Sequence, residues 1–279
     1  MVQNLTKKVS PASLEQEESI KESYTPQVIS ESAEESNENI TVADAVAQMF
    51  ENLGIKSAYG VSGGAMASLW GALSNSDVDV LNFRHEAGAA FAAIESYFAS
   101  GNPTVVFTTA GPGITNAYTT AGPGITNALT GLFAARGEGA KVILLSACTS
   151  APQRGRWAIQ ETSTDTLPSS GIFTTGTVFN YASTIESAAQ LPQIFRKLAL
   201  GLSQPGGYVA HITIPTAVQN MSMDEARLPE QGVSCSLVTS SSEVVANAAK
   251  LLCEGTFAIW LGFGARGAAD EIRQLAETT

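Results

Sequence analysis

The chain has 279 residues, of which 44% are hydrophobic and 15% charged, enough for one large domain or for one domain and part of a second. Its formal net charge of -11 argues against nucleic acid as a partner, because phosphate neutralisation needs clustered Lys and Arg. No apolar run has the length of a membrane span or of a signal-peptide core, so neither is expected.

Residues 1–40 form a leader rich in Ser and Glu, with eight Glu against three Lys. A segment of this composition buries too little apolar surface to offset its ordering entropy, and we predict that it is disordered. The three cysteines of the chain have no metal-binding spacing, which suits a reducing compartment and predicts a cytoplasmic protein without a metal site of its own.

From Thr41 onward, predicted helices and strands alternate. Because the strands are continuous apolar runs, we expect them to be covered on both faces, as in the doubly wound, mostly parallel sheet of an α/β fold with helices on both faces. The helices are expected at 42–53, 65–73, 86–99, up to about 135, and 184–202, and the strands at 57–61, 78–83, 104–108, 141–147 and 207–214.

The domain boundaries follow from changes in composition. Residues 41–218 are expected to form one domain, and the polar stretch 219–242 a linker. Residues 243–279 start a second α/β unit, with a helix at 243–252, a strand at 257–261 and a helix at 268–277. About 35 residues are too few for a parallel-sheet domain with its own core, so this is expected to be the incomplete, truncated start of a second α/β domain.

Three ionisable residues, Arg84, His85 and Glu86, stand where a predicted strand ends and a helix begins. Open α/β sheets bind ligands at this place, and Gly88, Ala89 and Ala90 leave room for another backbone or a flat ring to approach. The helix dipole also favours an acid in a first turn, so the residues alone leave a structural role for Glu86 open. His211, in the last strand of the domain, is expected to be structural.

An eleven-residue phrase occurs twice in tandem from Thr108 to Leu129, as TTAGPGITNAY and then TTAGPGITNAL. One copy suits a turn from strand to helix, in which glycine permits unusual backbone angles and proline fixes the corner. A Gly-Pro-Gly inside a helix would break it. We therefore predict that copy one ends the strand, copy two starts the helix, and one Gly-Pro-Gly bulges out as a loop.

Four segments, in this order, resemble the pyrimidine-binding domain of thiamine-diphosphate enzymes, with the acetolactate synthase branch most similar. They are GVSGGAMASLWGAL, FRHEAGAAFAAIESYFA, TTAGPGITNALTGL and AIQET. The resemblance covers about residues 41–218 and continues more weakly over 257–277, which looks like the opening of the middle domain of that family.

The resemblance implies roles for particular residues. Glu86 falls on the glutamate that hydrogen-bonds the aminopyrimidine ring and helps to form the carbon nucleophile, and Gln160 falls on a glutamine that faces the active centre. Both are expected to be catalytic. The expected cofactor-binding residues are Gly63, Gly64, Glu86, Gly111, Pro112, Gly113, Gly122, Pro123, Gly124 and Asn127.

The resemblance also implies thiamine diphosphate as the cofactor, with magnesium held by a diphosphate-binding domain that carries a GDG motif. No GDG occurs in this sequence. FAD is possible through the middle domain but unsupported: the GxGxxG pattern at residues 262–267 would also need an acidic residue about twenty positions further on, a position beyond residue 279. Since the family's active site lies between subunits, the expected partners are a second copy, as a homo-oligomer, or another chain supplying the diphosphate domain.

The implied reaction is decarboxylation of a 2-oxo acid followed by ligation of the product to a second carbonyl. Two other interpretations stay open at this point: a pyrimidine-domain subunit of a two-chain 2-oxo acid decarboxylase, and a non-catalytic truncated fragment, which the exact repeat and the end at Thr279 favour. The sequence fixes neither the substrate side chain, nor the acceptor, nor the oligomeric state.

Overall fold

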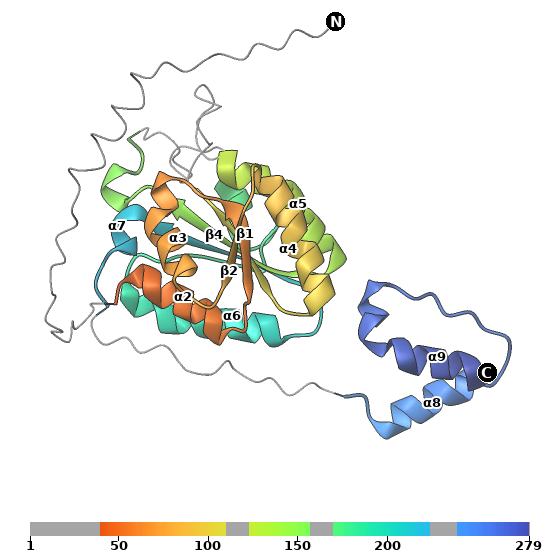
Figure 1. Cartoon of the computed structure of the whole chain (residues 1–279). Coiled ribbons are helices and arrows are strands. Elements are labelled where there is room, and N and C mark those ends of the chain that lie inside the picture. Colours follow the sequence, from red (N-terminus) through yellow and green to blue (C-terminus); the bar gives the residue numbers. More distant parts are fainter. Residues whose placement is uncertain (1–39, 110–122, 157–169, 224–238, 279) are drawn as a thin grey trace, which may run out of the picture. The chain divides into compact units, whose positions relative to one another are not determined.

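The computed structural model describes residues 40–109, 123–156, 170–223 and 239–278. Its centre is a six-stranded sheet in the order β2-β1-β3-β4-β6-β5, in which every pairing is parallel (Figure 1). The strands are β1 Ser57–Val61, β2 Asp79–Asn82, β3 Thr104–Thr108, β4 Lys141–Cys148, β5 Tyr181–Thr184 and β6 Tyr208–Pro215.

Helices cover both faces of this sheet (Figure 1). Helices α2 (Val42–Asn52), α3 (Ala67–Ser74) and α6 (Leu191–Ser203) pack on one face, and α4 (Glu86–Ser100) and α5 (Pro123–Glu138) pack on the other. The sheet thus separates two hydrophobic cores, one under each helix layer. In strand β3, Val105 and Phe107 belong to the core under α2, α3 and α6, and Val106 belongs to the core under α4 and α5. A sheet buried on both faces explains the continuous apolar strands and confirms the predicted α/β fold.

Local signals set the ends of the first helices much as expected. Thr41 caps α2 through a capping box, in which its side chain accepts from the backbone N–H of Asp44 and the Asp44 carboxylate accepts from the backbone N–H of Thr41. Helix α4 ends at Ser100 and is capped by Gly101, whose φ of 78° is a left-handed conformation that glycine adopts without strain. Strands β1 and β3 have the predicted bounds.

The expected helix over 184–202 is wrong in its first part. Residues Tyr181–Thr184 form β5, an edge strand paired with β6, and the helix α6 begins only at Leu191. Between them, Ser187 and Gln190 form a capping box around the short helix Ala188–Gln190, and a proline stands in the first turn of α6. These start signals lie inside the predicted helix, and the strand before them depends on pairing with a distant segment.

The described residues from 239 onward contain α8 (Ser242–Leu252), the short helix Phe263–Ala268 and α9 (Ala269–Thr278). Both helices agree with the prediction, and Ser241 caps α8. The strand expected at 257–261 is absent, and Trp260 in this segment is 97% exposed. A strand needs a neighbour to satisfy its backbone, and no described residue provides one here. The assignment of this segment to a second domain stays a prediction.

None of the helices in the described ranges is long and apolar enough to cross a membrane.

Candidate functional site

The strand order changes direction between β1 and β3. The connection from β1 to β2 runs through α3 on one face, whereas the connection from β2 to β3 runs through α4 on the other. At such a point the segments that follow the two central strands diverge, and this leaves a crevice at the carboxyl ends where open α/β sheets bind ligands. Three segments lie at this end of the sheet: the turn after β1, the start of α4, and the end of β3 with Thr108 and the following Thr109.

Gly63 lies in the turn after β1 and touches the end of β3. A Cβ atom on Gly63 would lie 2.7 Å from Oγ1 and 2.8 Å from Cβ of Thr109, which is closer than real Cβ contacts come. Thr109 itself is buried, with 5% of its surface exposed. Gly63 is therefore fixed by a tight contact, whereas no atom lies within 4 Å of a Cβ built on Gly64, which begins the short helix Gly64–Met66.

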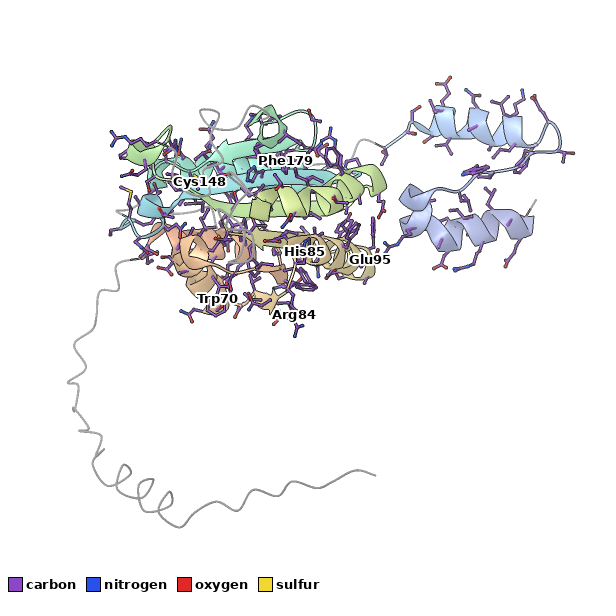
Figure 2. All side chains as sticks on the ribbon, turned by 90° about the horizontal axis from the view of Figure 1, so that it is seen from above. Trp70, Arg84, His85, Glu95, Cys148 and Phe179 are labelled. Carbon is purple, nitrogen blue, oxygen red and sulfur yellow. The ribbon has the colours of Figure 1, made fainter. Side chains whose placement is uncertain are left out.

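Glu86 is the first residue of α4 and is only 4% exposed. His85 is the N-cap, and its Nδ1 accepts a hydrogen bond of 3.2 Å from the backbone N–H of Ala87. His85 and Arg84 are both exposed, and Figure 2 shows Arg84 pointing away from the domain. Of the three ionisable residues at this place, only the glutamate is therefore buried, where the positive end of the helix dipole favours its charge.

Asn127 meets Glu86 from the neighbouring helix. Helix α5 begins at Pro123, and four residues later the side-chain amide of Asn127 donates a hydrogen bond of 3.1 Å from Nδ2 to Oε2 of Glu86. The two residues are 41 positions apart in the chain. No described residue donates to the other carboxylate oxygen, Oε1. Among the described residues, the buried carboxylate of Glu86 is thus held by a side chain through Oε2 alone.

A close crossing of α4 and α5 holds this pair in place. Ala90 and Gly131 each lie one helical turn after Glu86 and Asn127, and a Cβ atom on Gly131 would lie 2.5 Å from the Cβ of Ala90. Only glycine allows the two helices to approach this closely. The approach keeps the first turn of α5 within hydrogen-bond reach of the start of α4.

A second polar cluster lies inside the same core, around His211. Its Nε2 lies 2.8 Å from Oγ of Ser146 and 2.8 Å from Oγ1 of Thr213, and the ring packs on Phe179. Burial lowers the pKa of His211 to about 4, although a hydrogen bond to the backbone of Phe173 opposes this shift. The imidazole is therefore neutral at pH 7 and ties β4 to β6, which supports the structural role expected for it.

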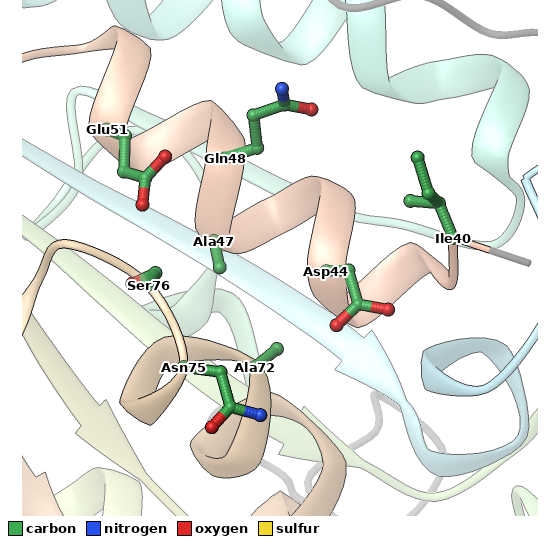
Figure 3. A pocket seen from close by; sticks show the side chains of 8 residues that line it. All are labelled: Ile40, Asp44, Ala47, Gln48, Glu51, Ala72, Asn75 and Ser76. Atoms are coloured by element: carbon green, nitrogen blue, oxygen red, sulfur yellow. The ribbon is translucent and has the colours of Figure 1, made fainter. Parts of the chain in front are cut away.

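A shallow pocket lies in the opposite helix layer, between α2 and the end of α3 (Figure 3). Its two carboxylates already have backbone partners: Asp44 accepts from the backbone N–H of Thr41, and Glu51 accepts from that of Asp77 at 2.8 Å. The polar lining of this pocket therefore serves helix capping and loop anchoring. It is separated by the sheet from the pair of Glu86 and Asn127.

The structure places several of the candidate residues and leaves others outside the described ranges. Glu86 and Asn127 come together, Gly63 and Gly64 lie at the crevice, Pro123 starts α5, and Gly124 is buried in its first turn. Gln160 and the glycines and proline Gly111, Pro112, Gly113 and Gly122 lie outside the described residues.

Two expectations for the repeat are confirmed: copy one ends the strand at Thr108, and copy two starts the helix at Pro123. The loop expected between them lies outside the described residues. Sequence reasoning missed Thr109, which packs on Gly63, and Gly131, which packs on Ala90. The signals for both were present, as a hydroxyl residue directly after an apolar strand and a glycine inside a helix.

Comparison with known proteins gives a family match over this region. Residues 40–120 and 117–168 match the model described as thiamine pyrophosphate enzyme, N-terminal TPP binding domain. The two matched segments overlap inside the tandem repeat.

Similar curated proteins include the probable acetolactate synthase large subunit of Methanocaldococcus jannaschii, which is 30% identical over 246 residues. That alignment covers 84% of this chain and 38% of the relative. The acetolactate synthase isozyme 1 large subunit of Escherichia coli is 29% identical over 241 residues, covering 85% of this chain and 39% of the relative. The chain thus spans less than two fifths of the length of these relatives.

Among solved structures, the thiamine diphosphate-dependent 4-hydroxybenzoylformate decarboxylase of Rhodococcus jostii RHA1 superposes with a TM-score of 0.61 at 13% sequence identity. The superposition covers 76% of this chain and 37% of the decarboxylase. At this level of identity the likeness concerns the fold.

Proposed function

Residues 40–168 belong to the thiamine pyrophosphate enzymes as their N-terminal TPP binding domain, and we propose that Glu86 in this domain binds the pyrimidine end of thiamine diphosphate. The observation that carries the proposal is the geometry of Glu86, a buried carboxylate at a helix start with Oε2 held by Asn127 and no described donor on Oε1. A ring with a nitrogen donor fits this arrangement.

The surface beside Glu86 is open at two glycines. A Cβ on Gly64 would meet no atom within 4 Å, and one on Gly88, in the first turn of α4, would meet only Cδ1 of Phe83, at 3.7 Å. Gly63 closes the other side against Thr109. Because these glycines carry no side chain that would block the approach of a flat ring to Glu86, the residues present fit the pyrimidine.

The chemical role that we assign to this chain is to hold or share a proton at one carboxylate oxygen, Oε1 of Glu86. Thiamine diphosphate, when bound, supplies a carbon nucleophile that adds to the carbonyl group of a 2-oxo acid. We assign to Glu86 a hydrogen bond with a ring nitrogen through Oε1, where it holds or shares a proton. Exclusion of water around the buried carboxylate strengthens such a bond, and the hydrogen bond to Asn127 keeps the carboxylate in one orientation.

For the assembled enzyme we propose the acetolactate synthase type of reaction, namely decarboxylation of a 2-oxo acid and ligation to a second carbonyl. The relatives support this choice, since two of them are named as acetolactate synthase large subunits. We assign the binding of the diphosphate and of magnesium to a separate diphosphate-binding domain. That domain would come from another subunit of a homo-oligomer or from a different partner chain. Gln160 is proposed to face the substrate.

Calorimetric titration of the full chain with thiamine and with thiamine diphosphate plus magnesium tests the binding role. Because this domain is assigned the pyrimidine end, both compounds should bind to the chain with similar affinity. Glu86→Gln should weaken both about tenfold or more, as expected for loss of one hydrogen bond to a charged group. Glu95→Gln is the matched control, because Glu95 is an exposed glutamate on the same helix (Figure 2).

Equal affinity in Glu86→Gln and Glu95→Gln would contradict the assignment of Glu86. The reaction is tested by pyruvate consumption, with and without a diphosphate-binding domain added from a related enzyme. Turnover that depends on the added domain and is lost in Glu86→Gln supports the proposal. Turnover that survives Glu86→Gln would contradict the mechanism, and turnover by the chain alone would contradict the assignment of the diphosphate to a separate domain.

A further inference from the structure

The tandem repeat offers two asparagines for the same place beside Glu86. The first ten residues of the two copies are identical, so Asn116 of copy one and Asn127 of copy two follow the same Gly-Pro-Gly-Ile-Thr sequence. Local sequence therefore gives neither copy an advantage in forming the turn. In the structure it is Asn127 whose Nδ2 lies 3.1 Å from Oε2 of Glu86.

The residues that follow copy two explain this choice. Downstream of Asn127, helix α5 buries Ile125, Ala128, Leu132 and Ala135 against the sheet, at the spacing of one helical face. With copy one in the same register, eleven residues earlier, the place of Leu132 would fall to Ala121 and that of Ala135 to Gly124. The core would lose most of a leucine side chain and one methyl group, and it would gain voids.

The close crossing of α5 with α4 also favours copy two over copy one as the start of the helix. In the shifted register Thr120 would take the place of Gly131, where even a Cβ atom would lie 2.5 Å from the Cβ of Ala90. Pro123 would also fall inside the helix, where proline removes a backbone hydrogen bond and breaks the turn. Core volume, helix spacing and proline position thus all favour copy two.

We infer that Asn127 is the positioning residue of Glu86, and that the second copy of the repeat alone supplies it. The inference rests on the proposed function in one respect, since it is the cofactor role of Glu86 that makes its orientation matter. By donating to Oε2, Asn127 fixes the rotation of the carboxylate and directs Oε1 away from α5.

The two copies give a matched pair of variants, Asn127→Asp and Asn116→Asp, to be compared as full chains by thermal unfolding from pH 8 to pH 4. Both changes keep the shape of the side chain and add one acid. In Asn127→Asp a second carboxylate lies where Nδ2 donated to Glu86, so the Tm at pH 8 should fall by roughly 5 °C below that of Asn116→Asp.

The pH dependence separates this pair from an ordinary structural contact. As the pH falls, one of the two facing carboxyl groups takes up a proton and can donate to the other, so the Tm difference should shrink towards zero. The neighbouring charged groups on these helices are Arg84 and His85, exposed at the start of α4, and Arg136, which donates to the backbone of Val178. Both variants contain all three, so their own pH dependence cancels in the Tm difference.

A donor swap keeps the test decisive if Asn127→Asp does not fold. In the double variant Glu86→Gln with Asn127→Asp, the introduced amide can donate to the introduced carboxylate, and the Tm should return to within about 2 °C of wild type. A double variant no more stable than Asn127→Asp would overturn the pairing. Equal effects of the two single variants, or a larger effect at Asn116, would overturn the assignment to copy two.

Thiamine titration of the same two single variants completes the experiment. Asn127→Asp should bind thiamine about tenfold more weakly than Asn116→Asp, because the carboxylate it leaves is misoriented. If the wild-type chain bound no thiamine, the proposed function would fail while the Tm contrast still stood. If thiamine bound equally to both variants, the positioning role would be refuted even with the cofactor role of Glu86 intact.

Discussion

Gly131→Ala is the substitution for which the structure gives the clearest expectation. The added methyl group would lie 2.5 Å from the Cβ of Ala90 and 3.3 Å from backbone atoms of Ala90 and Phe91. These atoms belong to helix α4 itself and cannot rotate away, as the end of a long side chain could. To reach an ordinary contact of about 3.5–4 Å, helices α4 and α5 must separate by roughly 1 Å.

Two opposing effects decide whether Gly131→Ala raises or lowers the free energy of unfolding. Alanine is the better helix former by about 1 kcal/mol, so in open space the change would stabilise the protein. Overpacking a tight contact costs typically 1–3 kcal/mol, and here it opens the whole α4–α5 interface. We therefore expect a net loss of about 1–2 kcal/mol in the free energy of unfolding and a Tm lower by roughly 5 °C.

Gly137→Ala is the matched control in the same helix. No atom lies within 4 Å of a Cβ at Gly137, so only the propensity term remains and the variant should be more stable than wild type, by up to about 1 kcal/mol. Urea unfolding of the two full-length variants measures the difference. Thiamine affinity measured beside it should fall only in Gly131→Ala, because widening the helix pair draws Asn127 away from Glu86.

The reasoning is refuted if Gly131→Ala is as stable as Gly137→Ala, since the helices would then not cross at the distance that the structure gives. If Gly131→Ala were stable and bound thiamine as wild type, the close contact of α4 with α5 would not be needed to hold Asn127 beside Glu86.

Two other predictions concern the crevice and the buried histidine. Gly63→Ala should weaken thiamine binding about tenfold, because the methyl group would displace Thr109. Gly71→Ala, in α3 and with no atom within 4 Å of its added Cβ, should bind as wild type, and calorimetry compares the two. The pKa of His211 is about 4 in the folded chain, below its ordinary 6.5, so the stability it contributes is complete above pH 6.5 and is lost as the pH falls towards 4. Urea unfolding should show about 2–3 kcal/mol of this loss between pH 7 and pH 4.5, and an unchanged slope in His211→Gln would contradict it.

Much of the fold could be predicted from local patterns. Strands β1 and β3 are short apolar runs between clear turn signals, and the start of α2 is predicted by its N-cap residue Thr41. The segments that went wrong depend on distant partners. Strand β5 exists because β6 pairs with it, and residues 257–261 are not a strand because no described neighbour pairs with them. Backbone pairing between remote segments leaves little trace in local composition.

The sequence by itself determined the α/β class and the place of Glu86 at the start of a helix, because hydrophobic periodicity and turn residues are local properties. It also showed that one of two Gly-Pro-Gly turns must start the next helix, but ten identical residues cannot express a preference between the copies. Only the tertiary structure decided it. Leu132 fills the core and Gly131 admits Ala90 when copy two leads the helix, and that register carries Asn127 to Glu86 across 41 positions of sequence.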